Sequence, residues 1–274
     1  MLEVLAPGPL ATVQDGGRHG YADLGVARSG AFDRAALRAS NRLVGNDDGA
    51  AAIELTLGGL VLLAHDAATI ALTGAPCTGL DAGAAITLPA GAVVRLGAPA
   101  SGLRSYLAVR GGLAVPTVLG SRSTDTLSGL GPAPLREGER LRVGSQPAGE
   151  VSGTPLVRPV AAPILRVIPG PRDDWFTAGA MDALCSTAWT VRPDSNRIGV
   201  RLDGPALPRV RSDELASEPT LPGALQVPPD GRPILLGPDA PVTGGYPVIA
   251  VVRDADLDAV AQARAGDRLR FVSS

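Results

Sequence analysis

Short apolar runs separated by glycine and proline are the main pattern of this chain. The 274 residues include 35 Gly and 25 Pro, which are spread along the whole sequence instead of gathering in tracts. Short apolar runs with frequent turn residues are typical of β-strands. The pattern therefore predicts a mainly β protein with strands at LEVLA (2–6), GLVLLA (59–64), ATIALTG (68–74), AVVRLG (92–97), RSYLAVRGG (104–112), ERLRVG (139–144) and PILLG (233–237).

Helical patterns are few and short. Residues 32–46 form one candidate, with Asp33 as the N-cap and Gly45 as the stop signal. Residues 172–186 form a second candidate, whose first turn carries acids that the helix dipole favours. Residues 254–266 form a short third. We therefore expect only a few short helices beside the strands.

The chain divides most naturally near its middle. Residues 146–162 are rich in Pro, Gly, Ser and Ala and have no hydrophobic period, so we interpret them as a linker between units 1–145 and 163–274. Both units begin alike, with LEVLAPGPL (2–10) and LRVIPGPRD (165–173), and further echoes follow in the same order. These echoes favour two related β units that arose by duplication, against chance similarity of turn residues.

Composition excludes several kinds of chemistry. The net charge is −2 without a basic block, which disfavours nucleic acid as a partner. All 25 cationic residues are Arg. Without lysine there is no Schiff base, no pyridoxal phosphate anchor, no P-loop and no attachment point for biotin. If ATP or biotin takes part, another chain must bring the usual lysine.

Cysteine and histidine are too scarce to suggest a metal site. Cys77 and Cys185 lie far apart in sequence, and His19 and His65 do not cluster with them. We expect no metal, and a reduced, cytoplasmic setting. The first residues show no basic and apolar leader, and no run has the roughly 18 apolar residues of a membrane span.

Three stretches concentrate polar residues and glycine. The first, residues 13–33, is a long Gly-rich loop of the kind that often binds a ligand, although a pair of surface hairpins would look the same. The second, residues 192–205, contains Ser195 before Arg197, which could clamp a carboxylate or pair with a neighbouring acid. The third, residues 217–234, carries Glu218, Gln226 and Asp230. The turn at 121–125 either binds phosphate or caps itself.

The stretch DAPVTGGYP (239–247) follows a strand-like run and combines an acid, a hydroxyl, two glycines and a tyrosine. Successive amides at Gly244 and Gly245, with the Thr243 hydroxyl, could form a nest that holds a negative oxygen. Asp239 and Tyr246 could orient a ligand or transfer a proton. A ligand loop and an ordinary turn are the two interpretations.

Taken in order, these motifs resemble a known family. The motifs that match are PGPLATVQDGGRHGYADLGVARSGAFD, NRLVGN, AIELTLGG, ALTGA, RSYLAVRGGLAVPTVLGSRST, VIPGPRDDWF, DSNRIGVRLDGP, SEPTLPGALQVPPDGRPI and DAPVTGGYPVIAVV. The chain resembles, nearly end to end, the carboxyltransferase-domain family that includes the C subunit of 5-oxoprolinase, allophanate-hydrolase-like and urea-carboxylase relatives, and the antagonist of a sporulation kinase inhibitor. It departs from many relatives at Val242 and Val248, where a polar residue and a cation are common.

The resemblance implies two barrel-like units of the cyclophilin-like kind. It also implies an obligate companion related to the kinase inhibitor, which is the B-like subunit of 5-oxoprolinase, together with an A-like subunit. On this basis the 239–247 stretch is expected to be a ligand loop. Catalytic roles are expected for Arg197, Asp239, Thr243 and Tyr246. Substrate binding is expected for Gln14, Asp15, Arg18, Tyr21, Ser29, Ser195, Glu218, Gln226, Asp230, Gly244 and Gly245.

Three functions are open at this point. The first is a subunit of an ATP-dependent 5-oxoprolinase that opens 5-oxoproline to L-glutamate, with ATP bound with or by a partner. The second is the carboxyltransferase half of a biotin-dependent urea or allophanate pathway, with biotin on another chain. The third is a non-catalytic module that antagonises a kinase-inhibitor-like partner. A chain without a biotin carrier favours the first.

Overall fold

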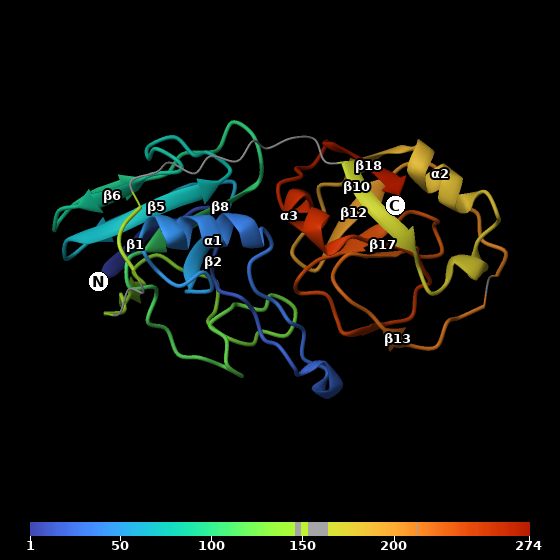
Figure 1. Cartoon of the computed structure of the whole chain (residues 1–274), viewed down its shortest axis with the longest axis horizontal. Coiled ribbons are helices and arrows are strands. Elements are labelled where there is room, and N and C mark those ends of the chain that lie inside the picture. Colours follow the sequence, from blue (N-terminus) through green and yellow to red (C-terminus); the bar gives the residue numbers. More distant parts are fainter. Residues whose placement is uncertain (146–148, 153–163, 212) are drawn as a thin grey trace. The chain divides into compact units, whose positions relative to one another are not determined.

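The computed structural model of the chain divides into two units, each built mainly from β-strands (Figure 1). It describes residues 1–145, 149–152, 164–211 and 213–274. The first unit holds Met1–Arg18, Asp33–Asp125 and the described residues between Gly129 and Ser152. The second holds His19–Phe32, Thr126–Ser128 and the described residues from Ile164 onward. Two segments from the first half of the sequence thus belong to the second unit.

Two antiparallel sheets form the first unit. One has the strand order β7 (Val93–Arg95), β4 (Leu60–Ala64), β1 (Leu2–Pro7) and β9 (Arg140–Leu141). The other has the order β2 (Leu10–Gln14), β3 (Ala52–Thr56), β8 (Arg104–Val109), β5 (Ala68–Gly74) and β6 (Ala85–Leu88). Apolar residues of both sheets share one core, to which Val4, Leu62, Ile53 and Leu107 belong. All six residues of β8 are buried because this strand lies in the middle of its sheet.

Helix α1 (Arg34–Leu43) lies against β5 and β8 (Figure 1). Asp33 caps its N-terminus, since the Asp33 carboxylate accepts a hydrogen bond of 2.8 Å from the Ala36 amide. The helix ends before Gly45, which has a φ of +71°. A Cβ at Gly45 would lie 2.5 Å from the carbonyl oxygen of Gly149, so only glycine fits there. The predicted first helix and both of its end signals are confirmed.

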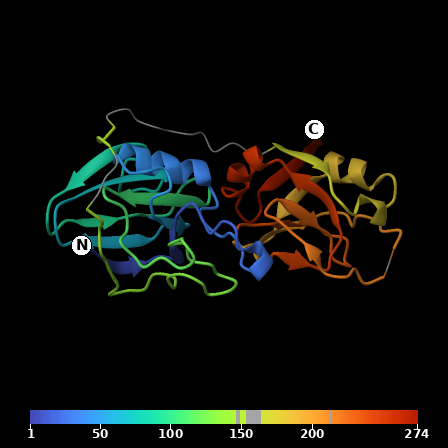
Figure 2. The same ribbon diagram turned by 60° about the horizontal axis from the view of Figure 1, so that its bottom comes forward.

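The second unit is a closed barrel. Its strand order is β10 (Ile164–Pro169), β17 (Val248–Val252), β14 (Ala224–Gln226), β15 (Ile234–Leu236), β12 (Gly199–Asp203), β11 (Ala188–Val191) and β18 (Arg268–Ser273). The barrel closes through a parallel pairing of β10 with β18. A separate ladder joins β13 (Glu218–Pro219) to β16 (Thr243–Gly244). These strands, in yellow to red, curve around one interior (Figure 2).

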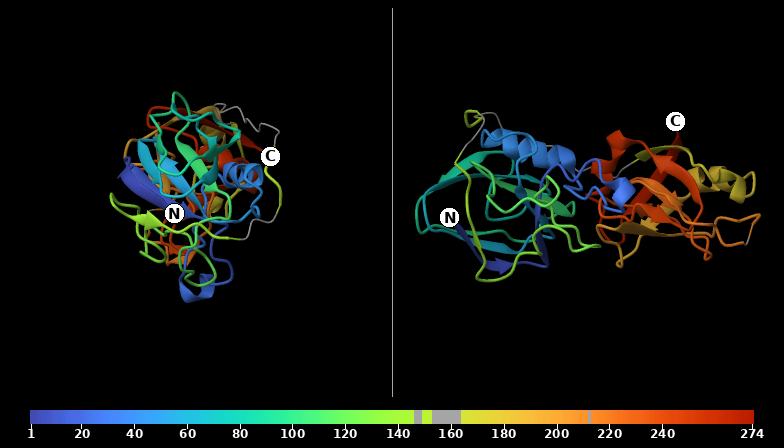
Figure 3. Two further views of the ribbon diagram at one scale, coloured as in Figure 1. Left: turned by 90° about the vertical axis from the view of Figure 1, so that its left-hand side faces the viewer. Right: turned by 90° about the horizontal axis from the view of Figure 1, so that it is seen from below.

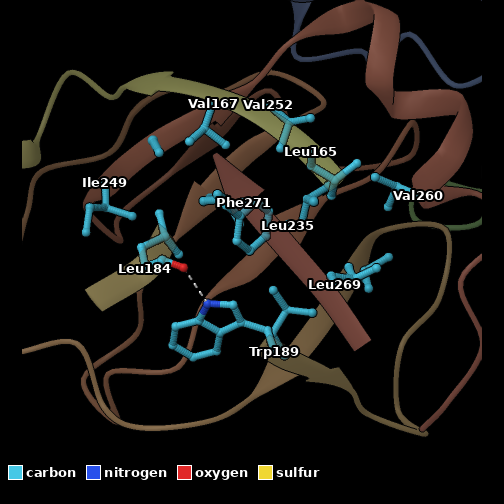
Figure 4. Packing of buried hydrophobic residues seen from close by; sticks show 14 of the residues in the cluster. Leu165, Val167, Leu184, Trp189, Leu235, Ile249, Val252, Val260, Leu269 and Phe271 are labelled. Carbon is cyan, nitrogen blue, oxygen red and sulfur yellow. Dashed lines mark hydrogen bonds between the residues drawn. The ribbon is translucent and has the colours of Figure 1, made fainter. Parts of the chain in front are cut away.

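Alternating apolar residues fill the interior of this barrel. Along β18 the side chains of Leu269 and Phe271 are buried, whereas Arg268 and Arg270 are exposed, as the period of two in a strand requires. Trp189 is fully buried, and its indole nitrogen donates a hydrogen bond of 2.9 Å to the Leu184 carbonyl (Figure 4). The predicted mainly β class with few helices is confirmed.

The second predicted helix, 172–186, is broken in the structure. A 3-10 turn, η2 (Asp173–Trp175), precedes α2 (Ala180–Ser186), which lies beside β18 on the outside of the barrel (Figure 3). Between them Phe176 has an extended backbone and pairs with Arg209. Burial of Trp175 and Phe176 in the barrel core therefore outweighs the helical pattern. The third candidate is short, as predicted, and consists of η3 (Asp254–Asp256) and α3 (Leu257–Val260).

The predicted boundaries, 1–145 and 163–274, and the predicted duplication stay predictions. Of the predicted linker, 146–162, only residues 149–152 are among the described residues. A further short 3-10 turn, η1 (Ala22–Leu24), lies in the segment that joins the second unit. Among the described helices, none combines the length and hydropathy needed to cross a membrane.

We predict that Phe271→Ala destabilises the second unit. The substitution leaves a cavity in the barrel core, which should lower the free energy of unfolding by about 3–5 kcal/mol. Val272 is the matched control, because it is the next residue of the same strand and is 40% exposed. Denaturant unfolding followed by tryptophan fluorescence reports on this unit, since Trp175 and Trp189 both lie in it. An effect of Phe271→Ala no larger than that of Val272→Ala would contradict the described packing.

Candidate functional site

The Asp239 carboxylate is the centre of a buried polar cluster in the second unit. The side chain of Asp239 is fully buried and accepts hydrogen bonds of 2.8 Å from both Nε and Nη2 of Arg197. It also accepts from the Ser29 hydroxyl (2.7 Å), the Thr126 hydroxyl (2.7 Å) and the Thr126 amide (3.0 Å). One carboxylate therefore holds together segments 29–30, 126, 197 and 239 of the chain.

The backbone reinforces this cluster. Arg197 Nη2 donates to the Gly30 carbonyl over 2.6 Å, and the Gly237 amide donates to the Ile198 carbonyl over 2.9 Å. A Cβ at Gly237 would lie 2.2 Å from the Arg197 carbonyl oxygen, so this close approach requires glycine. The turn that carries Asp239 is thus positioned by both main-chain and side-chain contacts.

Burial alone would raise the pKa of Asp239, but the Arg197 charge and the hydrogen bonds from Arg197, Thr126 and Ser29 outweigh burial. The pKa of Asp239 consequently lies below its ordinary value, and the carboxylate stays ionised. Such a carboxylate has no proton to give and no open face for a ligand. The structure places Asp239 and Arg197 in a buried pair with each other, and their expected roles in proton transfer and in clamping a substrate stay predictions.

A second buried cluster, in the first unit, uses three more of the expected site residues. The Asp15 carboxylate accepts hydrogen bonds of 2.6 Å from each of the Ser121 and Ser123 hydroxyls. Arg18 donates to the Val118 and Ser123 carbonyls, and Gln14 donates to the Thr124 carbonyl over 2.9 Å. Of the two interpretations left open for the turn at 121–125, the structure contains the capped turn.

Gln14, Asp15 and Arg18 are all buried, with exposed fractions of 0%, 8% and 2%. Their side chains hold the 118–124 loop and offer a ligand no open surface. Their expected role in substrate binding stays a prediction. Ser29 is also buried, in the Asp239 cluster.

Other expected residues close turns or pair strands. The Tyr21 carbonyl accepts from the Leu24 and Val26 amides around η1. The Ser195 hydroxyl accepts a hydrogen bond of 3.0 Å from the Arg201 amide in β12. Glu218, in β13, accepts hydrogen bonds of 2.9 and 3.0 Å from Arg172 Nε.

The predicted amide nest is not formed. A nest needs successive amides in a turned backbone of alternating handedness, whereas Thr243 and Gly244 form the extended strand β16. Neither Gly244 nor Gly245 has a positive φ. The two glycines serve close packing, because a Cβ at Gly244 would lie 2.5 Å from Gln226 Nε2 and one at Gly245 would lie 3.2 Å from the Leu215 carbonyl oxygen.

A cleft of about 840 Å³ lies in the second unit, beside the end of the 239–247 loop. Its size is that of a small-molecule site. The residues that line it are Arg209, Val210, Arg211, Asp213, Glu214, Leu215, Pro229, Gly245, Tyr246 and Pro247. Tyr246 lines the cleft and is 45% exposed.

Several of the expected site residues lie near Arg209, which is itself in the lining of the cleft. Burial lowers the pKa of Arg209, and the nearby Asp230 and Tyr246 oppose this shift through their charges. Arg209 also donates a hydrogen bond to the Val227 carbonyl. Three expected residues, Asp230, Gly245 and Tyr246, therefore lie around an arginine that sequence reasoning missed. We take this cleft as the candidate site.

A rigid segment positions the arginines of the cleft. The Val210 amide donates to the Trp175 carbonyl over 2.9 Å, and the Thr177 amide donates to the Pro208 carbonyl over 3.1 Å. The guanidinium of Arg211 lies 5.5 Å from the centre of the Trp175 ring, within the range of a cation–π contact. Because Trp175 is part of the barrel core, Arg209 and Arg211 are anchored to that core.

The residues that line the cleft do not fit a nucleoside triphosphate such as ATP. Asp213 and Glu214 line the same space as the two arginines, and their charge opposes a polyphosphate. The sequence has no lysine and no P-loop. Among the described residues, no group of three or more His, Cys, Asp or Glu side chains could hold a metal ion. We therefore derive no step of ATP chemistry on this chain.

Known proteins are similar to this chain along nearly its whole length. The sequence pattern of the family described as "Carboxyltransferase domain, subdomain A and B" matches residues 24–273. The chain belongs to this carboxyltransferase-domain family. Its relative from Escherichia coli K12, the C subunit of 5-oxoprolinase, is 41% identical over 99% of this chain and 91% of that protein. The corresponding C subunit of Haemophilus influenzae is 34% identical over 99% of this chain and 90% of that protein.

Solved structures of the family have the same fold. TTHA0988 superposes with a TM-score of 0.89 at 40% identity, and this chain covers 55% of that chain. The Kluyveromyces lactis urea amidolyase superposes with a TM-score of 0.92 at 34% identity, and this chain covers 18% of it. The chain thus spans about half of TTHA0988 and less than a fifth of the urea amidolyase.

The missed residues left only a weak signal in the sequence. RVRSDE (209–214) places two arginines next to two acids, but such a run usually marks a solvated surface. Tertiary contacts, among them the pairing of Arg209 with Phe176, hold this segment, which lines the same cleft as Tyr246.

We predict that Asp239→Asn destabilises the protein and removes part of the pH dependence of its free energy of unfolding. Loss of one partner leaves Arg197 buried without its counter-charge, which should cost about 3–5 kcal/mol at pH 7. Because the pKa of Asp239 is lowered in the folded state, its contribution is present above the unfolded pKa of about 3.9 and is lost as pH falls through the folded value. The difference between wild type and variant should therefore narrow below about pH 4.

Denaturant unfolding between pH 3 and pH 8 measures this difference. Asp194→Asn is the control, because Asp194 forms an exposed ion pair with Arg192. Parallel stability curves for wild type and Asp239→Asn across the whole range would contradict the role given to the buried pair.

Proposed function

We propose that this chain is the C subunit of a 5-oxoprolinase, an enzyme complex that opens 5-oxoproline to L-glutamate with hydrolysis of ATP. The observation that carries the proposal is the 41% identity to the E. coli C subunit over 99% of this chain and 91% of that protein. Identity of this extent along nearly the full length of both chains supports the same role in the same kind of complex. The chain acts with a B-like companion and an A-like subunit, in the cytoplasm, where ATP is available.

The candidate site supports a substrate-handling role for this chain. The cleft joins an open tyrosine, Tyr246, to two core-anchored arginines, and the Asp239–Arg197 pair positions the loop that carries Tyr246. Thr243, Gly244 and Gln226 lie along the same loop and its neighbouring strand. The mixed charges of the cleft suit a small polar substrate better than a triphosphate, so ATP is bound with or by a partner.

A carboxyltransferase role is the second candidate. It is favoured by the superposition on the K. lactis urea amidolyase, with a TM-score of 0.92. In that case biotin is carried by another chain, because this chain has no lysine to which biotin could be attached. The arginines and acids that line the cleft are compatible with urea as well as with 5-oxoproline as the substrate.

We predict that the chain, purified with its natural partners, releases ADP from ATP only when 5-oxoproline is added, and forms L-glutamate in equal amount. Avidin, which captures biotin, should leave the rate unchanged. The control is the partner mixture without this chain, which should be inactive. Turnover that depends on urea and is blocked by avidin would overturn the proposal in favour of the second candidate. Assembly without turnover on any of these substrates would instead leave a non-catalytic binding module.

A further inference from the structure

Arg209 has an unusual environment for a cation in the wall of a cleft. Its side chain is half-buried, and its Nε atom is buried with no hydrogen-bond partner among the described residues. The Val227 carbonyl accepts from its Nη2, and Asp230 is near enough to act on Arg209 through its charge, but among the described residues no carboxylate forms an ion pair with Arg209. A partly desolvated guanidinium is costly, and an anion in the cleft would lower that cost through its charge.

The charges around Arg209 define what kind of anion fits. Asp213 and Glu214 line the same cleft, which makes the lining nearly neutral when Arg209 and Arg211 are counted. A dianionic phosphate would be attracted by the arginines and repelled by the acids. A ligand with one carboxylate and one or more N–H donors satisfies both kinds of lining group, since Asp213 and Glu214 accept hydrogen bonds.

The wall that carries Arg209 is preformed. The backbone on both sides of Arg209 is hydrogen-bonded to Trp175, which belongs to the barrel core, and to Thr177, which follows shortly after it. Pro229 and Pro247, on other lining segments, have restricted backbones. Little conformational entropy remains to be lost when a ligand binds, so a small molecule can be recognised by few contacts.

We propose that this cleft binds a small carboxylate that also carries an amide or ammonium N–H, and that Arg209 pairs with the carboxylate of the ligand. Tyr246, beside Arg209, offers its hydroxyl to the polar part of the ligand, and the carboxylates of Asp213 and Glu214 accept from the N–H. The choice of 5-oxoproline as the probe rests on the proposed function, because 5-oxoproline has one carboxylate and one lactam N–H.

The test compares two probes on the full chain. Saturation-transfer NMR titrations measure binding of 5-oxoproline and of 2-pyrrolidinone, which is the same lactam ring without the carboxylate. We expect 5-oxoproline to bind at least about tenfold more tightly, as a charge-assisted hydrogen bond would give. Equal binding of both probes, or no binding of either, would overturn the inference. This comparison needs only the wild-type protein.

Variants then locate the binding. Arg209→Leu should abolish the tenfold preference for 5-oxoproline, and Arg209→Lys should keep part of it, because lysine retains the charge without the planar fork. Arg192→Leu is the matched control, since Arg192 is an exposed arginine of the same unit that pairs with Asp194 outside the cleft. The control should bind both probes as wild type does, and the Tm of each variant shows whether it is folded. A folded Arg209→Leu variant with wild-type preference would overturn the inference.

The result can be separated from that of the proposed function. If the assembled complex turns over 5-oxoproline but this chain shows no preference for the carboxylate, the proposed function stands and the cleft is not the site. If the chain prefers the carboxylate but the complex shows no turnover with 5-oxoproline, the site stands and the proposed function fails.

Discussion

A buried ion pair between Asp239 and Arg197 organises the second unit. Removing two charges from water is costly, and such a pair adds little net stability compared with well-packed apolar groups. Its effect here is on geometry, because the Asp239 carboxylate accepts hydrogen bonds from Ser29, Thr126 and Arg197 and so holds three segments of the chain at one point. Two of these donors come from the first half of the sequence. The pair therefore fixes the positions of the loops that carry Ser29, Thr126 and Arg197 relative to Asp239.

The loop that follows Asp239 depends on this constraint. The strand β16 and the residues up to Pro247 begin at a turn that cannot shift without breaking the ion pair or the contact at Gly237. From there the chain passes close by Gln226 and Leu215, where a side chain in place of Gly244 or Gly245 would crowd its neighbours. Contacts of the residues before Tyr246 therefore fix its position in the cleft, and precise positions of this kind are important in an active site.

Because arginine is the sole cationic residue of this chain, its way of pairing with carboxylates affects the structure. Arginine pairs with carboxylates through two parallel hydrogen bonds, as Arg197 does with Asp239 and Arg42 does with Asp48. Because arginine remains charged at any ordinary pH, a buried arginine must find an anion or bear the cost of burial. Arg197 has its anion within the chain. For Arg209, in the wall of a cleft, we look for the anion in a ligand.

The sequence by itself determined the class of fold, because alternation and turn residues are local signals: the predicted strands, such as 60–64 and 104–109, and the first helix with its Asp33 cap can be read from it. It also picked out the polar loops. What only the tertiary structure decided is which polar residues are buried. Arg18 looks no different in sequence from Arg209, yet Arg18 holds a loop together and Arg209 lines the cleft. Likewise the broken helix at 172–186 follows from burial of Trp175 and Phe176. The physical reason is that burial is set by contacts between residues far apart in the chain, and a local pattern carries no information about which distant segment will cover it.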